Sequence, residues 1–192
     1  MTSQLILASS SPYRRELLTR LRIPFDYHSP AIDEERRAEE APEALVQRLA
    51  EEKARRVAED HPGAWIIGAD QVACCGEQIL GKSGNAENAR KQLIAMQGRT
   101  VTLLNGLCLL APSGQARVEL VPYRVDLRCL SPEEIDRYIE KEEPFDCAGS
   151  LRAEGLGICL IERMCGEDPN AIIGLPLIRL ATMLREAGFS LP

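Results

Sequence analysis

The chain has 192 residues, 45% of them hydrophobic, so it is long enough to bury its own core, and its formal charge of −6 disfavours a general attraction to nucleic acid polymers. No stretch is long and apolar enough for a membrane span. The seven cysteines are scattered and odd in number, which excludes a complete disulfide framework and indicates a reduced, cytoplasmic protein. Small anions are therefore better candidate ligands than polymers or membranes.

The first half of the chain predicts strands alternating with helices. The apolar run Leu5–Ala8 predicts a short strand, and leucines at helical spacing predict a helix over 13–21 that Ser11 caps, with Pro12 at its first position. Four further elements are expected: a strand over 25–29, a long helix over 43–60, a strand over 65–75 in a hairpin with 78–80, and a helix over about 85–97.

The second half predicts a long hairpin followed by helices. Two β-rich stretches, 100–111 and 115–129, flank a turn, and a capping box at Ser131 opens a helix to about residue 141. A short strand over 158–161 and a final helix to Ala187 complete the pattern. This order predicts a mixed α/β (α+β) fold, an elongated mixed sheet flanked by helices. We expect two lobes around a deep cleft, the first formed by about residues 1–80 with the last helix and the second by the middle of the chain.

An anion site is indicated where the first strand turns into the first helix. Ser9 offers a hydroxyl, Arg14 a guanidinium, and the helix its free backbone N–H groups, a combination that suits a triphosphate. An ordinary serine cap with surface arginines is the alternative.

Two carboxylate positions could serve hydrolysis. Asp70 ends an apolar strand, where a carboxylate is costly to bury without a partner or a task, and there it could deprotonate a water. Glu34 lies in an acidic loop and has the oxygen ligands that Mg²⁺ prefers beside phosphate. An ion-paired Asp70 and a merely solvated loop remain the alternatives.

Lys53 and Lys82 are candidate phosphate-neutralising cations. Lys82 lies in Gly76–Ser83, which literally satisfies the P-loop pattern G-x-x-x-x-G-K-S. The spacer, residues 77–80, is bulky and is typical of a returning hairpin strand, so we reject a P-loop.

The glycine-rich stretch 147–157 allows the backbone to approach a flat ligand closely. Glu154 within it could accept hydrogen bonds from the edge of a base. Glycines used only for turns are the alternative.

Taken together, the segments around these residues resemble the Maf family of nucleotide pyrophosphatases over residues 5 to about 177. They are Leu7–Arg15, Asp33–Glu34, Glu52–Ala54, Gly68–Gln71, Gly81–Lys82 and Gly174–Pro176. The resemblance implies a single Maf-like domain over 1–192, with a fold like that of inosine triphosphatases. It implies a divalent metal, Mg²⁺ or Mn²⁺, and attack of water at the α-phosphorus of a small-molecule nucleotide.

The resemblance also implies roles for single residues. Asp70 would accept the proton of the attacking water and Glu34 would bind the metal. The phosphates would be bound by Ser9, Arg14, Lys53 and Lys82.

Three positions, Tyr13, Gln71 and Glu154, resemble the YceF branch of the family, which acts on 7-methyl-GTP. An acidic Glu154 and a stackable Tyr13 suit the positive ring of a methylated guanine. The chain departs from the pattern at Ser83, where the family usually has proline, and at Tyr13, where the branch often has tryptophan. The alternatives are a pyrophosphatase for dTTP, UTP or another modified nucleotide, and a non-catalytic nucleotide-binding regulator of cell division. A homodimer is compatible with the sequence.

Overall fold

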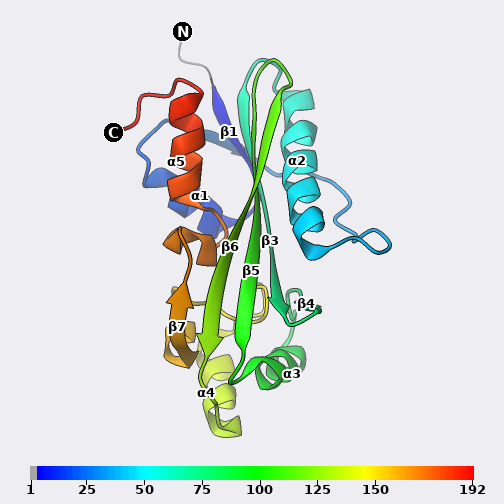
Figure 1. Cartoon of the computed structure of the whole chain (residues 1–192), viewed down its shortest axis with the longest axis vertical. Helices are drawn as coiled ribbons and strands as arrows, with labels where there is room; N and C mark the ends of the chain where they lie inside the picture. Colours follow the sequence, from blue (N-terminus) through cyan, green and yellow to red (C-terminus); the bar gives the residue numbers. More distant parts are fainter. Residues whose placement is uncertain (1–3) are drawn as a thin grey trace. The chain divides into compact units, whose positions relative to one another are not determined.

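The computed structural model describes residues 4–192 and contains one seven-stranded mixed sheet with helices packed on it (Figure 1). The strand order is β2-β1-β3-β5-β6-β7, and β4 pairs with β3. The elements are β1 (Leu5–Ala8), α1 (Pro12–Thr19), β2 (Asp26–His28), α2 (Pro42–Asp60), β3 (Trp65–Cys75), β4 (Gln78–Leu80), α3 (Ala86–Met96), β5 (Thr100–Leu110), β6 (Ala116–Leu127), α4 (Pro132–Glu142), η1 (Leu156–Leu160), β7 (Ile161–Cys165), η2 (Pro169–Ile172) and α5 (Leu177–Glu186). The predicted α/β class with a mixed sheet is confirmed.

The chain forms two compact units, and β3, β5 and β6 contribute residues to both. Unit 1 comprises residues 1–71, 105–121 and 168–192, and unit 2 comprises 72–104 and 122–167. The two-lobe expectation had placed the first boundary near residue 80 and the whole middle of the chain in the second lobe. That was wrong in detail, because the tip of the β5–β6 hairpin belongs to unit 1.

In unit 1 the alternation of side chains along each strand builds two apolar layers. Leu5 and Leu7 of β1 pack with α1 and α5 on one face, whereas Ile6 and Ala8 pack with α2 on the other. Figure 1 shows α1 and α5 on one side of β1 and α2 on the opposite side. Both layers are buried, which explains why β1 reads as a continuous apolar run.

Helix α2 lies unusually close to the sheet of unit 1 because two glycines face it. A Cβ added to Gly68 would lie 2.0 Å from the carbonyl oxygen of Ala50, and one added to Gly106 would lie 2.0 Å from that of Val46. Any side chain at either position would push the helix away. The glycines therefore fix the distance from α2 to β3, and with it the reach of side chains between them.

In unit 2, α3 and α4 pack against each other, and α4 opens with the predicted capping box. The Ser131 hydroxyl accepts from the Glu134 N–H while the Glu134 side chain accepts from the Ser131 N–H. The hydroxyl of Tyr138 on α4 donates to the carbonyl of buried Ser150 and accepts from the Arg152 N–H. The glycine-rich segment is thereby tied to α4.

Most predicted elements are confirmed within a few residues, with one clear error. The strand expected over 158–161 begins only at Ile161, because residues 156–160 form a 3₁₀ helix. The final helix begins at Leu177, after a short 3₁₀ turn over Pro169–Ile172. Within residues 4–192, no helix combines the length and apolarity that crossing a bilayer requires.

Candidate active site

The centre of the candidate site is an ion-pair cluster at the carboxyl end of β3. Lys53 Nζ on α2 lies 2.6 Å from Asp70 Oδ1 and 2.9 Å from Glu34 Oε1. The Lys53 and Asp70 side chains are 7% and 9% exposed, whereas Glu34 is 58% exposed. Asp70 follows Gly68 on the α2 face of the strand, so the close approach of α2 is what brings Lys53 within reach. The structure therefore brings Lys53, Glu34 and Asp70 together and shows Asp70 ion-paired, and the roles predicted for the three residues stay predictions.

Arg14 adds a second cation to this cluster. It lies in the first turn of α1, and its Nε donates to the Gly174 carbonyl across 2.9 Å. Burial lowers the pKa of the Arg14 guanidinium, while the neighbouring carboxylates of Asp70 and Glu34 raise it. The Gly174 carbonyl accepts a hydrogen bond from Nε alone, so the two outer guanidinium nitrogens are available to bind an anion.

Ser9 and Ser11 shape the turn that leads from β1 into α1. The Ser9 hydroxyl accepts from the Ser11 N–H across 3.1 Å, and the Ser11 hydroxyl accepts from the Arg14 N–H. Because β1 runs parallel to β3 with Ala8 opposite Gly68, Ser9 comes at the same edge of the sheet as Asp70. Tyr13, partly exposed, follows in the first turn of α1. The predicted anion-binding turn is thus at the predicted catalytic carboxylate.

Gln71 projects to the other face of β3 from Asp70, as expected for a regular strand. Its Nε2 donates to Asn105 Oδ1 across 3.1 Å and to the Ala171 carbonyl across 2.8 Å. A Cβ added to Gly174 would lie 3.4 Å from both Gln71 Oε1 and Arg14 Nε. The oxygen end of the Gln71 amide is therefore on the Arg14 side.

The loop that carries Glu34 is attached to α2 through Arg48. The Arg48 guanidinium donates to both Glu40 carboxylate oxygens, at 2.6 and 2.8 Å, and to the Glu35 carbonyl at 3.1 Å. It also pairs with Glu52, one turn along the helix. This bidentate pairing lowers the pKa of Glu40 to about 2, mainly through the hydrogen bonds from Arg48. The loop is therefore an anchored segment of unit 1.

Lys82 and Glu154 belong to unit 2. Lys82 is exposed, and its backbone pairs with Ala148 in an isolated antiparallel bridge. The next residue, Ser83, is buried, and its hydroxyl has no hydrogen-bond partner among the described residues. Glu154 is exposed, with one oxygen 3.8 Å from the Arg152 guanidinium. The roles predicted for Lys82 and Glu154 stay predictions.

The structure explains the P-loop pattern as a hairpin. Gly76, at φ +61°, forms the turn between β3 and β4, and Gln78–Leu80 is a strand. Helix α3 does not begin until Ala86, so no helix N-terminus follows Lys82 and Ser83 as a phosphate cradle requires.

Two buried polar residues of unit 1 were missed by the sequence reasoning. Asn105 is fully buried on β5, and Asp168 is 2% exposed before η2. Asp168 accepts from the N–H groups of Asn170, Ile178 and Arg179, so it caps both η2 and α5. For Asn105 the available signal was a single amide within an otherwise apolar strand.

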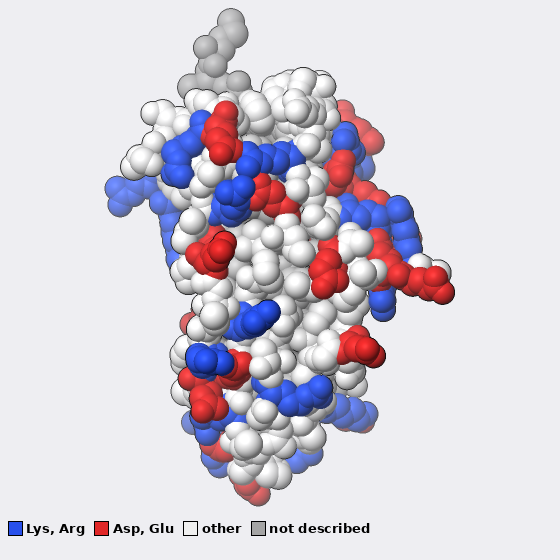
Figure 2. Space-filling view, in the orientation of Figure 1, with Lys and Arg blue, Asp and Glu red and all other residues white. Residues whose placement is uncertain are grey.

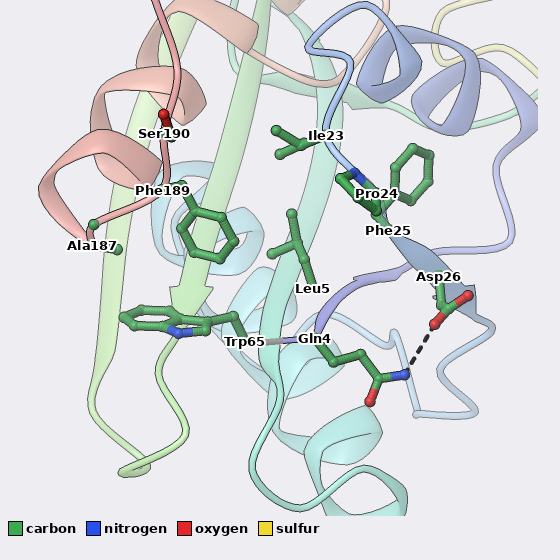
Figure 3. Close-up of a pocket in the computed structure, with 11 residues that line it drawn as sticks. Gln4, Leu5, Ile23, Pro24, Phe25, Asp26, Trp65, Ala187, Phe189 and Ser190 are labelled. Carbon is green, nitrogen blue, oxygen red and sulfur yellow. Dashed lines mark hydrogen bonds between the residues drawn. The ribbon is translucent and has the colours of Figure 1, made fainter. Parts of the chain in front are cut away.

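An apolar cavity of about 600 Å³ in unit 1 lies away from this cluster (Figure 3). Trp65 and Phe189 meet edge to face in its wall, and Asp26 accepts from Gln4 at its rim. Trp65 begins β3, whereas Asp70 lies five residues further on, roughly 16 Å along the strand. The cavity is therefore not the candidate active site.

The distribution of charged side chains and the set of possible metal ligands restrict which ligands the protein could bind. On the face shown in Figure 2, acidic and basic side chains are interspersed, unlike the basic stripe of a nucleic-acid-binding surface. Among residues 4–192, no group of three or more His, Cys, Asp or Glu side chains could hold a metal alone. Glu34 and Asp70 nevertheless converge on one cationic position, now held by the Lys53 ammonium. Two carboxylates with phosphate oxygens are a usual Mg²⁺ donor set, so these residues fit a metal bound together with substrate.

Several known proteins resemble this chain along nearly its whole length. A relative from Pseudomonas fluorescens (strain Pf0-1) is 52% identical over 98% of both chains, and one from Pseudomonas syringae pv. tomato is 54% identical over 98% of both. A third, from Alcanivorax borkumensis, is 50% identical over all of this chain and 98% of its own. All three are named 7-methyl-GTP pyrophosphatase. The family model described as Maf-like protein matches residues 4–187, and the chain therefore belongs to the Maf family.

Proposed function

We propose that this protein hydrolyses 7-methyl-GTP to 7-methyl-GMP and pyrophosphate. The observation that carries the proposal is the cluster of Asp70, Lys53 and Glu34 beside Arg14, which combines an acceptor for a proton, a carboxylate for a metal and two cations. The names of relatives that are about half identical over nearly the whole chain support the choice of nucleotide.

The reaction needs a water held in line with the bond between the α- and β-phosphates. Asp70 Oδ1 is taken by Lys53, and Oδ2 has no hydrogen-bond partner among the described residues, so Oδ2 is the base that removes the proton from water. The water oxygen bonds to the α-phosphorus, the bond to the bridging oxygen breaks, and pyrophosphate leaves with that electron pair.

Cations offset the charge that develops on the phosphate oxygens. Arg14 and Lys53 neutralise it from unit 1, and the Ser9 hydroxyl and the start of α1 supply hydrogen-bond donors. A divalent metal, Mg²⁺ or Mn²⁺, bound by Glu34 together with the substrate would supply a Lewis acid for the phosphate oxygens. Lys82 of unit 2 keeps its proposed role as a further phosphate-binding cation.

Selectivity for the methylated base is assigned to Tyr13, Gln71 and Glu154. Methylation at N7 makes the guanine ring cationic, so an aromatic face and acceptor or anionic oxygens favour it over guanine. Within residues 4–192 no disulfide joins any of the seven cysteines, which supports a reducing, cytoplasmic location.

Product analysis tests the proposal. With Mg²⁺ present, 7-methyl-GTP should give 7-methyl-GMP and pyrophosphate at a higher kcat/KM than GTP, dTTP or UTP. In ¹⁸O-labelled water the label should enter 7-methyl-GMP, because attack is at the α-phosphorus. Label in free phosphate, or nucleotide binding without any turnover, would refute the reaction.

A second measurement tests the base. Asp70→Asn should lower kcat by roughly 10²–10⁴-fold, the usual contribution of a positioned general base. Asp60→Asn, at an exposed carboxylate on the far end of α2, should leave kcat unchanged. Full activity of Asp70→Asn would remove Asp70 from the mechanism.

A further inference from the structure

Asn105 is a fully buried amide beside the candidate active site, and no role has yet been given to it. Its neighbour Gly106 faces α2, so Asn105 points to the opposite face of β5, the face of Leu107 and Leu109. Burying an amide is costly unless both of its ends form hydrogen bonds. Here both do: Nδ2 donates to the Val121 carbonyl across 3.1 Å, and Oδ1 accepts from Gln71 Nε2 across 3.1 Å.

The first of these bonds fixes the orientation of the Asn105 amide. The carbonyl of Val121 can only accept, so the nitrogen end of Asn105 must face it. The oxygen end must then face Gln71. A backbone carbonyl can only accept, so exchanging the nitrogen and oxygen of the Asn105 amide would set two acceptor oxygens against each other.

The orientation of Gln71 is fixed by Asn105 together with two backbone carbonyls. Facing these acceptors, Gln71 must present its nitrogen, which donates to Asn105 Oδ1 and to the carbonyls of Ala171 and, across 3.4 Å, Ile172. Its oxygen Oε1 is left on the side of Gly174 and Arg14, and it has no hydrogen-bond partner among the described residues. Rotating the amide by half a turn would place an N–H₂ group beside the Arg14 guanidinium and an oxygen against three acceptors.

We infer that Asn105 is a positioning residue that keeps the Gln71 oxygen, rather than its nitrogen, turned toward the nucleotide. An acceptor oxygen selects ligand groups that donate, and the N–H groups of a cationic, N7-methylated guanine are stronger donors than those of guanine. Asn105 thereby contributes to base selectivity without touching the base. The inference rests on the proposed function through the role given there to Gln71.

The test compares kcat/KM for 7-methyl-GTP with that for GTP. In Asn105→Leu the ratio of the two should fall by roughly five- to tenfold, the worth of one hydrogen bond. In a Gln71→Ala background the same substitution should change the ratio no further, because Asn105 acts only through Gln71. Two results would overturn the inference. One is the wild-type ratio of kcat/KM values in Asn105→Leu, and the other is a double variant whose ratio falls further than that of Gln71→Ala alone.

Two further variants separate positioning from general damage. Leu107→Ala removes a fully buried side chain from the same face of β5 and should lower the melting temperature while leaving the ratio unchanged. Asn105→Asp keeps both bonds only while the buried acid is protonated, when its O–H can donate to Val121 and its C=O can accept from Gln71. The ratio of kcat/KM values in Asn105→Asp should therefore approach that of the wild type as the pH falls. A ratio that stays equally far below the wild-type value at every pH would contradict the inference.

A readout independent of turnover distinguishes this inference from the proposed function. The side-chain N–H₂ protons of Gln71, observed by NMR, should exchange with water faster in Asn105→Leu than in the wild type. If the wild type releases no pyrophosphate, the proposed function fails, and the exchange rates still decide whether Asn105 holds Gln71. Equal exchange rates in the two proteins would refute the positioning role.

Discussion

Lys53 and Asp70 form a nearly buried ion pair in which the ammonium also contacts Glu34, so a single cation is shared by two carboxylates. Both members of the pair are more than nine-tenths buried, and a buried charge deprived of its partner is strongly destabilising. The same lysine therefore supports the fold of unit 1 and holds the two carboxylates together.

Lys53→Met should cost about 3 kcal/mol in the free energy of unfolding, because Asp70 is left buried without its cation. It should also make the protein more responsive to metal, since Mg²⁺ can now take the position between Asp70 and Glu34. Thermal denaturation with and without Mg²⁺ measures both effects. The rise in melting temperature caused by Mg²⁺ should be larger in Lys53→Met than in the wild type, and an equal rise would count against a metal between these carboxylates.

Arg48→Leu should release the loop that carries Glu34 from α2. We expect KM for the metal–nucleotide complex to rise several-fold, and the melting temperature to fall, because the Glu40 carboxylate loses the cation that stabilises it. Arg55→Leu is the matched control, because Arg55 is an exposed arginine of the same helix paired within it to Glu51. If both variants have the same KM as the wild type, the loop does not depend on Arg48.

The pH dependence of this anchor follows from the lowered pKa of Glu40. The carboxylate has a pKa of about 2 instead of its usual 4.5, so its stabilising contribution is fully present above pH 4.5 and is lost as the pH falls through about 2. An NMR titration of the Glu40 carboxyl carbon checks this. In Arg48→Leu the midpoint should move back toward 4.5, since the hydrogen bonds from Arg48 are its main cause.

Asp168→Ala should destabilise unit 1 by about 2 kcal/mol, because the N–H groups at the starts of η2 and α5 lose their acceptor. Urea denaturation measures the change. Asp136→Ala, at an exposed aspartate paired with Arg90, should change the free energy of unfolding by less than about 0.5 kcal/mol. Similar values for the two variants would show that Asp168 is not a structural cap.

Thiol labelling should divide the cysteines by burial. Burial is the main cause that raises the pKa of Cys108 and of Cys147 to about 12, so both stay protonated and unreactive at pH 8. The exposed residues Cys129, Cys159 and Cys165 should react with iodoacetamide. Mass spectrometry after brief labelling of the folded protein reads the result, and early modification of Cys108 would contradict its burial.

Local patterns were enough to predict most elements and to single out several candidate site residues. The apolar run that ends at Asp70, the capped turn with Ser9 and Arg14, and the acidic loop with Glu34 all depend on residues close together in sequence, where hydrophobic periodicity and capping chemistry act. The 3₁₀ helix over 156–160 was mistaken for a strand because a short apolar run fits either structure.

The sequence by itself determined which residue types stand at the carboxyl ends of β1 and β3, and hence that a carboxylate, hydroxyls and cations were available. Only the tertiary structure decided which of them pair. Lys53 reaches Asp70 because Gly68 and Gly106 let α2 approach the sheet, and Asn105 orients Gln71 from a strand 34 positions away in sequence. Such contacts depend on the packing distance between elements, which no local pattern of residues encodes.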